Sequence, residues 1–199
     1  MKNFRTCLWQ ITAKTNLHVG NEDSTSYGII DKAVQRDVLT GLPCINSSSL
    51  KGAINEYCCS GLDGKEVMSQ DEREWIFGSN KEDSNSPSKK GVAVFFDAQL
   101  LYLPVQDDDL LYIYITSDEV QNRLMDRLGL FGITETPAFK KIEGHDCVGN
   151  KKDSYELSQL CKNTNLPIIA RNVLVDGESK NLWYEQVIPA ETIFYAITQ

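Results

Sequence analysis

The chain has 199 residues, of which 41% are hydrophobic and 24% are charged, and its net charge is −8. This composition excludes a disordered or collagen-like chain and fits one globular domain with its own core. No stretch reaches the ~20 apolar residues of a membrane span, and the N-terminus lacks a secretory signal pattern, so we expect a cytoplasmic protein without membrane contact. The acidic balance argues against indiscriminate coating of nucleic acid but leaves room for a local basic groove.

The first half of the chain predicts a strand, a long loop and two helices. Residues 4–13 alternate between faces and favour a strand, and residues 14–27 then lose all periodicity. Apolar residues next recur at helical spacing over residues 50–58, with one of the serines 47–49 as the N-cap and Gly61 as the stop. A second short helix is predicted to begin at Ser69 with a capping box to Glu72, and to end at Gly78.

The second half predicts two hairpins around a third helix. Apolar, β-branched or aromatic runs predict strands at residues 92–105, 110–116, 168–175, 182–188 and 192–198. Ser117 is the expected cap of a helix that ends at Gly129 and turns Val120, Leu124, Met125 and Leu128 inward. Residues 130–165 are polar and irregular, and we interpret them as an insertion. The resulting order is β-α-β-β-α-β, so the fold class is α+β, with a ferredoxin-like or RRM-like palm and long insertions.

The segment 42–52 before the first helix is a candidate anion site. Three hydroxyl groups and the free N–H groups of a helix N-terminus meet Lys51, which lies outside the apolar face of that helix. A bound phosphate would explain a lysine in this unfavourable position. An ordinary serine cap with an exposed lysine explains the pattern equally well.

His18 and Asp31 are the chemically suggestive residues of the first loop. A lone histidine is more often structural than catalytic, and an acid after an apolar run is more often a turn or cap residue. The sequence contains no regularly spaced carboxylate pair, P-loop, G-x-G-x-x-G or G-x-S-x-G motif. None of its cysteines forms a C-x-x-C pair, so we expect reduced thiols and neither a disulfide framework nor a zinc knuckle.

Several of these segments together resemble one known family. They are, in order, residues 16–20 (NLHVG), 28–36 (GIIDKAVQR), 40–43 (TGLP), 48–52 (SSLKG), 76–78 (IFG), 96–98 (FDA) with 103–105 (LPV), and 182–185 (LWYE) with 188–189 (IP) and 192–195 (TIFY). The pattern resembles the RAMP superfamily of CRISPR–Cas proteins, and most closely the repeated backbone subunit of type III-B (Cmr) effector complexes. It spans nearly the whole chain.

The resemblance implies an architecture and a set of partners. It implies one RRM-like domain over residues 1–199 with an insertion at 130–165 and a protruding β-hairpin, the thumb, at 168–188. Family members continue for several tens of residues beyond the point where this chain stops, so we expect it to lack the family's C-terminal segment. The implied partners are CRISPR RNA, single-stranded target RNA, further copies of the chain and other Cmr-type subunits.

The resemblance also implies an activity and its residues. Each copy is expected to cleave paired target RNA as a metal-dependent endoribonuclease, with Asp31 as the catalytic residue and possible ligand of Mg²⁺ or Mn²⁺. The lysine of the S-S-L-K-G motif, Lys51, is expected to contact the guide-RNA backbone together with Ser48 and Ser49. His18 matches a histidine position of uncertain role. From the sequence itself, Lys32 and Arg36 add positive charge near Asp31, and Trp183 either stacks on RNA or anchors the base of the hairpin.

Other functions remain open at this point. A noncatalytic RAMP subunit that only binds guide RNA needs no acid at position 31. A guide-processing endonuclease would use two such palms, for which the chain is too short. A ferredoxin-like module that binds a small molecule is the least specific alternative.

Overall fold

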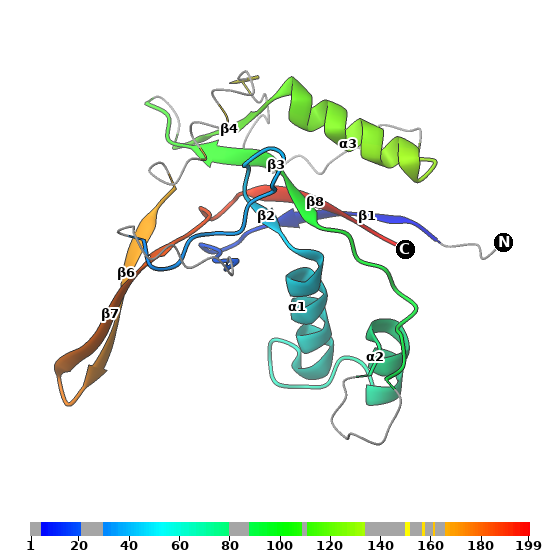
Figure 1. Cartoon of the computed structure of the whole chain (residues 1–199), viewed down its shortest axis with the longest axis horizontal. Helices are drawn as coiled ribbons and strands as arrows, with labels where there is room; N and C mark the ends of the chain where they lie inside the picture. The colour runs from blue at the N-terminus through cyan, green and yellow to red at the C-terminus, as the bar shows by residue number, and fades with distance from the viewer. Residues whose placement is uncertain are drawn as a thin grey trace. The chain divides into compact units, whose positions relative to one another are not determined.

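A computed structural model describes residues 5–20, 30–79, 88–108, 111–133, 150–151, 157, 161 and 166–199. The elements are, in chain order, β1 (Cys7–Thr12), β2 (Cys44–Ile45), α1 (Ser47–Ser60), α2 (Gln70–Phe77), β3 (Ala98–Val105), β4 (Ile113–Thr116), α3 (Asp118–Leu130), β5 (Asn150–Lys151), β6 (Ile168–Val175), β7 (Glu178–Gln186) and β8 (Ile193–Thr198) (Figure 1). The predicted β-α-β-β-α-β order recurs as β1, α1, β3, β4, α3 and β8.

The main sheet has the strand order β1-β8-β3-β4-β5, and β2 pairs with β3. β3 runs antiparallel to β4 and to β8, with Leu103 opposite Ile115 and Leu100 opposite Phe194. Every residue of β8, which lies between β1 and β3, is buried, so both faces of this strand are covered. The mixed helices and largely antiparallel pairing confirm the α+β class. The ferredoxin-like arrangement is not confirmed. In a ferredoxin-like sheet the first strand lies between two others, whereas β1 lies at the edge of the sheet that the described residues form.

The N-cap of helix α1 lies one residue before the serines 47–49, among which it was predicted. Its N-cap is Asn46, whose side chain makes no capping hydrogen bond. The N–H of Ser47 instead donates to Oδ1 of Asp97 at 2.6 Å, so a carboxylate 50 positions along the chain replaces the local cap. The predicted stop is confirmed: Gly61 has φ 58°, a left-handed conformation that glycine adopts without strain.

Helices α2 and α3 begin as predicted. Ser69 and Glu72 form both bonds of the capping box, and Ser117 accepts the N–H of Val120. The predicted end of α3 is wrong, because the helix continues through Gly129 to Leu130. The predicted inward position of Met125 is also wrong, since the residue is 36% exposed, whereas Val120, Leu124 and Leu128 are buried.

The chain divides into two compact units. Unit 1 comprises Met1–Trp9, Ile45–Ala98 and Ala196–Gln199, and unit 2 comprises Gln10–Cys44 and Gln99–Tyr195. Within unit 1, the rings of Phe77 and Phe95 stack at 5.8 Å, and Trp9 Nε1 donates to Thr198 Oγ1 at 2.8 Å. Unit 2 contains α3 and the β6–β7 hairpin. The prediction of one domain over residues 1–199 stays a prediction.

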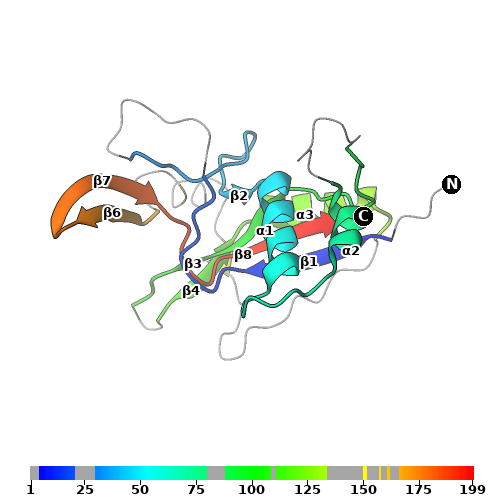
Figure 2. The same ribbon diagram turned by 90° about the horizontal axis from the view of Figure 1, so that it is seen from below.

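The predicted hairpin at residues 168–188 is a separate two-stranded sheet of β6 and β7. β7 begins earlier than expected, at Glu178, because the turn consists of only Asp176 and Gly177. Both turn residues have positive φ, 54° and 81°, as the tightest hairpin turns require. The hairpin projects from the rest of its unit (Figure 2), and most of its residues are exposed on both faces.

Several predictions fall outside the described residues. They concern residues 21–27 of the predicted loop at 14–27 and most of the insertion at 130–165. Among the helices that are described, none combines the length and the apolar character needed to span a membrane.

Candidate functional site

The base of the hairpin is bonded to the segment that contains Asp31. The N–H groups of Asp31 and Lys32 donate to the carbonyl of Tyr184 at 3.0 and 3.2 Å, and the N–H of Gln186 donates to the carbonyl of Lys32 at 2.9 Å. Lys32 and Glu185 thereby form a parallel β-bridge. The conformation of the first segment and the position of the hairpin are therefore coupled through main-chain hydrogen bonds.

Asp31 is exposed and uses one carboxylate oxygen to hold β7. Its Oδ2 accepts the N–H of Tyr184 at 2.7 Å, a short, charge-assisted hydrogen bond. No described residue contacts its other oxygen closely enough to form a hydrogen bond or ion pair. One carboxylate group therefore anchors the hairpin and still presents an acceptor to solvent.

The side chain of His18 contacts the next two residues of β7, Glu185 and Gln186. Its Nδ1 is 2.8 Å from the carbonyl oxygen of Gln186, and because a carbonyl only accepts, Nδ1 carries the proton. Its Nε2 is 3.6 Å from Oε1 of Glu185, whose Oε2 accepts from Nε of Arg171 at 3.0 Å. Arg171 and Glu185 are diagonal neighbours on one face of the hairpin, since Arg171 pairs with Trp183. The chain His18–Glu185–Arg171 thus joins the first loop to both strands of the hairpin.

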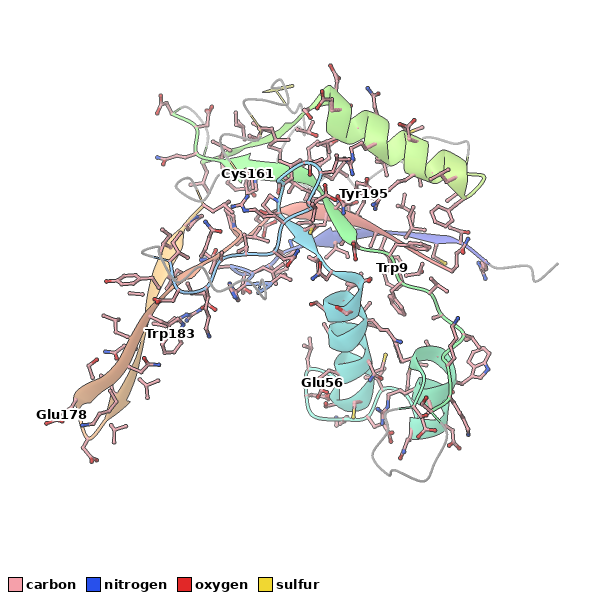
Figure 3. All side chains as sticks on the ribbon, in the orientation of Figure 1. Trp9, Glu56, Cys161, Glu178, Trp183 and Tyr195 are labelled. Atoms are coloured by element: carbon pink, nitrogen blue, oxygen red, sulfur yellow. The ribbon has the colours of Figure 1, made fainter. Side chains whose placement is uncertain are left out.

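Lys32 forms a cation–π pair with Trp183 of β7. The Nζ of Lys32 lies 5.1 Å from the centre of the Trp183 ring. Trp183 is half-buried part-way along β7, while Glu178 marks the tip of the hairpin (Figure 3). The two residues that were predicted separately to meet RNA therefore contact each other.

Arg36 and the buried Gln186 form a structural link beneath the hairpin. Gln186 is 0% exposed, and its Oε1 accepts from the N–H of Val34 at 3.3 Å and from Nη2 of Arg36 at 3.4 Å. Nη1 of Arg36 donates to the carbonyl of Gly41 at 3.0 Å. Burial lowers the pKa of Arg36 from its ordinary value, against the opposing effect of the Cys161 and Cys44 thiols. Through these contacts Arg36 holds residues 34–41 and Gln186 together beneath the site.

Gln186→Leu should lower the free energy of unfolding by about 2 kcal/mol, because the substitution leaves a buried N–H and a half-buried guanidinium without their shared acceptor. Urea unfolding followed by circular dichroism measures the change. Gln70→Leu is the matched control: its amide is exposed and bonds only Glu74 on α2, so we expect a change within ~0.5 kcal/mol. Equal effects of the two substitutions would contradict the role of Gln186.

The other predicted RNA-binding residues lie in unit 1, at the first turn of α1. Ser48 and Ser49 are exposed, and Lys51 is half-buried. The carboxylate of Asp97 already accepts a hydrogen bond from the first N–H of this helix, that of Ser47. An anion at this helix end would therefore use the N–H and hydroxyl groups of Ser48 and Ser49 and not that of Ser47.

A cavity of about 570 Å³ lies elsewhere in unit 2, between the N-terminal half of α3 and residues 39–42. None of the predicted site residues lines it. The predicted catalytic residues Asp31 and His18 lie instead at the hairpin base.

The sequence analysis missed Glu185, Arg171 and Gln186 as members of this site. Glu185 was part of a matched segment, but its only local signal is an acid after two aromatic residues. Arg171 and Gln186 carry no signal at all. Their contacts depend on the hairpin register and on main-chain bonds to residues about 150 positions earlier, which spacing along the chain does not reveal.

Within the part of the chain that is described, no three His, Cys, Asp or Glu side chains gather in a metal-binding group. At the hairpin base, Glu185 is engaged by His18 and Arg171. Asp31 is therefore the carboxylate available there for a ligand.

Comparison with known proteins identifies relatives of this chain and structures that share its fold. The CRISPR system Cmr endoribonuclease Cmr4 of Pyrococcus furiosus is 26% identical to this chain, over 92% of this chain and 77% of the relative. The cryo-EM structure of the type III-B Cmr-beta complex bound to cognate target RNA contains a chain with a TM-score of 0.68 and 22% identity, covering 98% of this chain and 84% of that chain. The crystal structure of oligomeric Cmr4 from Pyrococcus furiosus gives 0.63 and 20%, covering 98% and 81%.

The two structural matches show a shared fold. The model of the RAMP superfamily matches residues 10–197, which include both strands of the hairpin, Asp31, Lys51 and His18. The chain belongs to the RAMP superfamily.

Proposed function

We propose that the chain is the CRISPR RNA-binding backbone subunit of a type III-B effector complex and cleaves bound target RNA as an endoribonuclease. The observation that carries the proposal is the exposed carboxylate of Asp31, held at the base of a projecting hairpin. The likeness to a named Cmr endoribonuclease and to a chain of a Cmr complex bound to target RNA supports it. Further copies of the chain and other Cmr subunits are its partners, and its location is the cytoplasm.

The proposed chemistry needs few protein groups, because RNA carries its own nucleophile. The 2′-hydroxyl oxygen attacks the adjacent phosphorus and the bond to the 5′-oxygen breaks, which leaves a 2′,3′-cyclic phosphate and a 5′-hydroxyl. Asp31 accepts the proton of the 2′-hydroxyl, and the leaving 5′-oxygen gains a proton. His18 is our candidate donor of that proton: its Nδ1–H is bonded to the Gln186 carbonyl, so it would have to be the imidazolium and donate from Nε2, which faces Glu185.

The residues at the site fit a divalent metal that binds together with RNA. Mg²⁺ is commonly held by one or two carboxylates and by substrate phosphates, not by a complete protein cage. Asp31, with one carboxylate oxygen already bonded to Tyr184, would hold Mg²⁺ or Mn²⁺ through the other. With that oxygen on the ion, Asp31 would act as the metal ligand in place of the base, and the 2′-hydroxyl proton would pass to solvent. The ion would stabilise negative charge that develops at the scissile phosphate.

The hairpin has the features of a wedge. Val173, Leu174 and Leu182 near its tip are 43%, 63% and 53% exposed. Apolar side chains of this kind insert between stacked bases and displace them. A displaced base would allow the sugar to turn its 2′-hydroxyl into line with the scissile phosphate, which regular A-form geometry prevents. We therefore assign the thumb role to β6–β7.

Cleavage by the guide-loaded complex tests the proposed activity. With labelled target RNA and Mg²⁺ or Mn²⁺, we expect cleavage that EDTA abolishes and that excess metal restores, since charge stabilisation by the ion would be lost and regained. Cleavage that continues undiminished in EDTA would contradict the metal requirement but leave the nuclease assignment standing.

Lys51→Ala should weaken guide-RNA binding without changing the fold. The loss of one phosphate contact should reduce the slope of log affinity against log salt by ~0.7 for single-stranded RNA. Filter binding at several salt concentrations gives the slope. Lys65→Ala serves as control, because Lys65 is an exposed cation of the same unit already paired with Asp63 at 3.2 Å. Identical slopes for wild type and Lys51→Ala would make Lys51 an ordinary surface residue.

One observation favours the noncatalytic alternative. The Asp31 carboxylate has a structural task, the hydrogen bond from the Tyr184 N–H, which by itself explains an acid at this position. A subunit that only binds guide RNA could keep Asp31 for that bond alone. The substitution of Asp31 by asparagine separates the two functions, as discussed below.

A further inference from the structure

Lys32 has a fixed main chain and a directed side chain. Its N–H and carbonyl are both bonded to β7, to Tyr184 at 3.2 Å and to Gln186 at 2.9 Å. Only its side chain can therefore change position, and that side chain lies over the Trp183 ring, with Nζ 5.1 Å from the ring centre. An ammonium group over the face of an indole is attracted by the negative potential of the π system.

Lys32 also has a positive charge that is available to bind a phosphate beside Trp183. Arg171, which pairs across the hairpin with Trp183, is neutralised by Glu185 at 3.0 Å. Lys32 is exposed, and no carboxylate among the described residues pairs with it. An indole face holds an ammonium without neutralising its charge, so the positive charge of Lys32 can still attract a phosphate.

Trp183 is poorly placed to stack on a base. One face of its ring is covered by the Lys32 ammonium. Its Nε1 is buried and has no hydrogen-bond partner among the described residues. A base that stacked on the covered face would have to displace a charged group from a favourable contact.

We infer that Trp183 is a positioning residue, which holds the Lys32 ammonium against the base of the hairpin for a phosphate of the target RNA. The inference rests on the proposed function and replaces the expectation that Trp183 stacks on RNA. Lys32 binds the phosphate, and Trp183 acts only through Lys32.

The salt dependence of target-RNA binding by the guide-loaded complex tests this assignment. Lys32→Gln should reduce the slope of log affinity against log salt by ~0.7 to 0.9 for each copy that contacts RNA. Trp183→Leu should also reduce the slope, although it removes no charge, and should weaken binding about two- to fivefold per copy. The double variant should bind no more weakly than Lys32→Gln alone. Trp183→Phe keeps an aromatic face and should stay near the wild type.

Trp75→Leu is the control, because Trp75 is 66% exposed on α2 and belongs to unit 1. A normal slope for Trp183→Leu, with additive losses in the double variant, would overturn the inference and support stacking on a base. These comparisons are made against wild-type binding, so they are independent of whether the complex cleaves.

Fluorescence supplies a second readout that needs no RNA. The chain has three tryptophans, so Trp9→Phe with Trp75→Phe leaves Trp183 as the single tryptophan. In this double variant of the whole chain, Lys32→Gln should change the tryptophan emission, whereas Lys65→Gln should not. Unchanged emission in Lys32→Gln would overturn the inference even where Trp183→Leu fails to fold. A complex that neither binds nor cleaves target RNA would instead refute the proposed function, with the fluorescence result still deciding the contact.

Discussion

Asp31→Asn should abolish cleavage of target RNA while leaving RNA binding within about twofold of the wild type. The asparagine side chain keeps the shape of aspartate, and its carbonyl oxygen can still accept the N–H of Tyr184, so the hairpin base stays anchored. It cannot accept the 2′-hydroxyl proton, and it binds a divalent cation far more weakly than a carboxylate does. We expect a rate loss of at least ~10²-fold, the lower range for removal of a general base.

The comparison with Asp31→Ala separates chemistry from anchoring. Alanine removes the acceptor for Tyr184 as well as the charge, so this variant should also lose about 0.5–1.5 kcal/mol of stability. Asp31→Asn should change stability by less than ~0.5 kcal/mol, since the residue is exposed. Single-turnover cleavage, target binding and urea unfolding are measured for both variants in parallel.

Two outcomes for Asp31→Asn would contradict its catalytic assignment. Cleavage at the wild-type rate would leave the hydrogen bond to Tyr184 as the sole task of Asp31 and favour the noncatalytic alternative. Loss of both binding and cleavage would make Asp31 structural, and the catalytic group would then be sought at His18.

Deletion of Gly177–Lys180 should spare guide binding but disrupt the position of cleavage. The deletion removes the end of the hairpin, including Glu178 and Ser179, and leaves the pair Val173–Asn181 to close a shorter loop. The contacts at the base, from Arg171 and Glu185 to His18, lie on the far side of that pair and are kept. The deletion keeps Val173 and Leu182 in the strands but moves Leu174 into the loop, because its partner Ser179 is removed. The shorter wedge should therefore no longer displace a base, and the scissile sugar should lose its alignment.

Asp176→Asn is the control for this deletion. Asparagine tolerates the left-handed conformation of the turn, φ 54°, so it keeps both the length and the shape of the hairpin. Mapping product ends on a sequencing gel compares the variants. If the deleted hairpin cut at the same positions and at the same rate as the wild type, β6–β7 would have no thumb role.

Local signals in the sequence predicted the local structure well. The capping box of Ser69 and Glu72 and the cap Ser117 each depend on residues within a few positions of one another, and both are present. Helix α1 shows the limit of this reasoning. Its cap comes from Asp97, far along the chain, and no local pattern at residues 47–49 reveals it.

The candidate site was only partly predictable for the same physical reason. The matched segments located Asp31, His18 and Lys32, whose residue types carry the chemistry. Their arrangement depends on the pairing of residues 31–32 with β7, which also brings in Glu185 and Gln186. Such long-range contacts arise only when the hairpin base docks, so the sequence predicted candidate reacting groups without the groups that hold them.

The most informative measurement is a map of the cuts in a labelled target RNA. The cuts are made by a guide-loaded complex that is assembled with this chain. If each copy carries one cleavage site at Asp31, the cuts fall at one regular interval along the paired region, and their number equals the number of copies. Cyclic phosphate ends on the upstream products would accompany them. A target that binds the complex and remains intact in Mg²⁺ and Mn²⁺, or that is cut without a regular interval, would contradict the assignment of this chain as the nuclease.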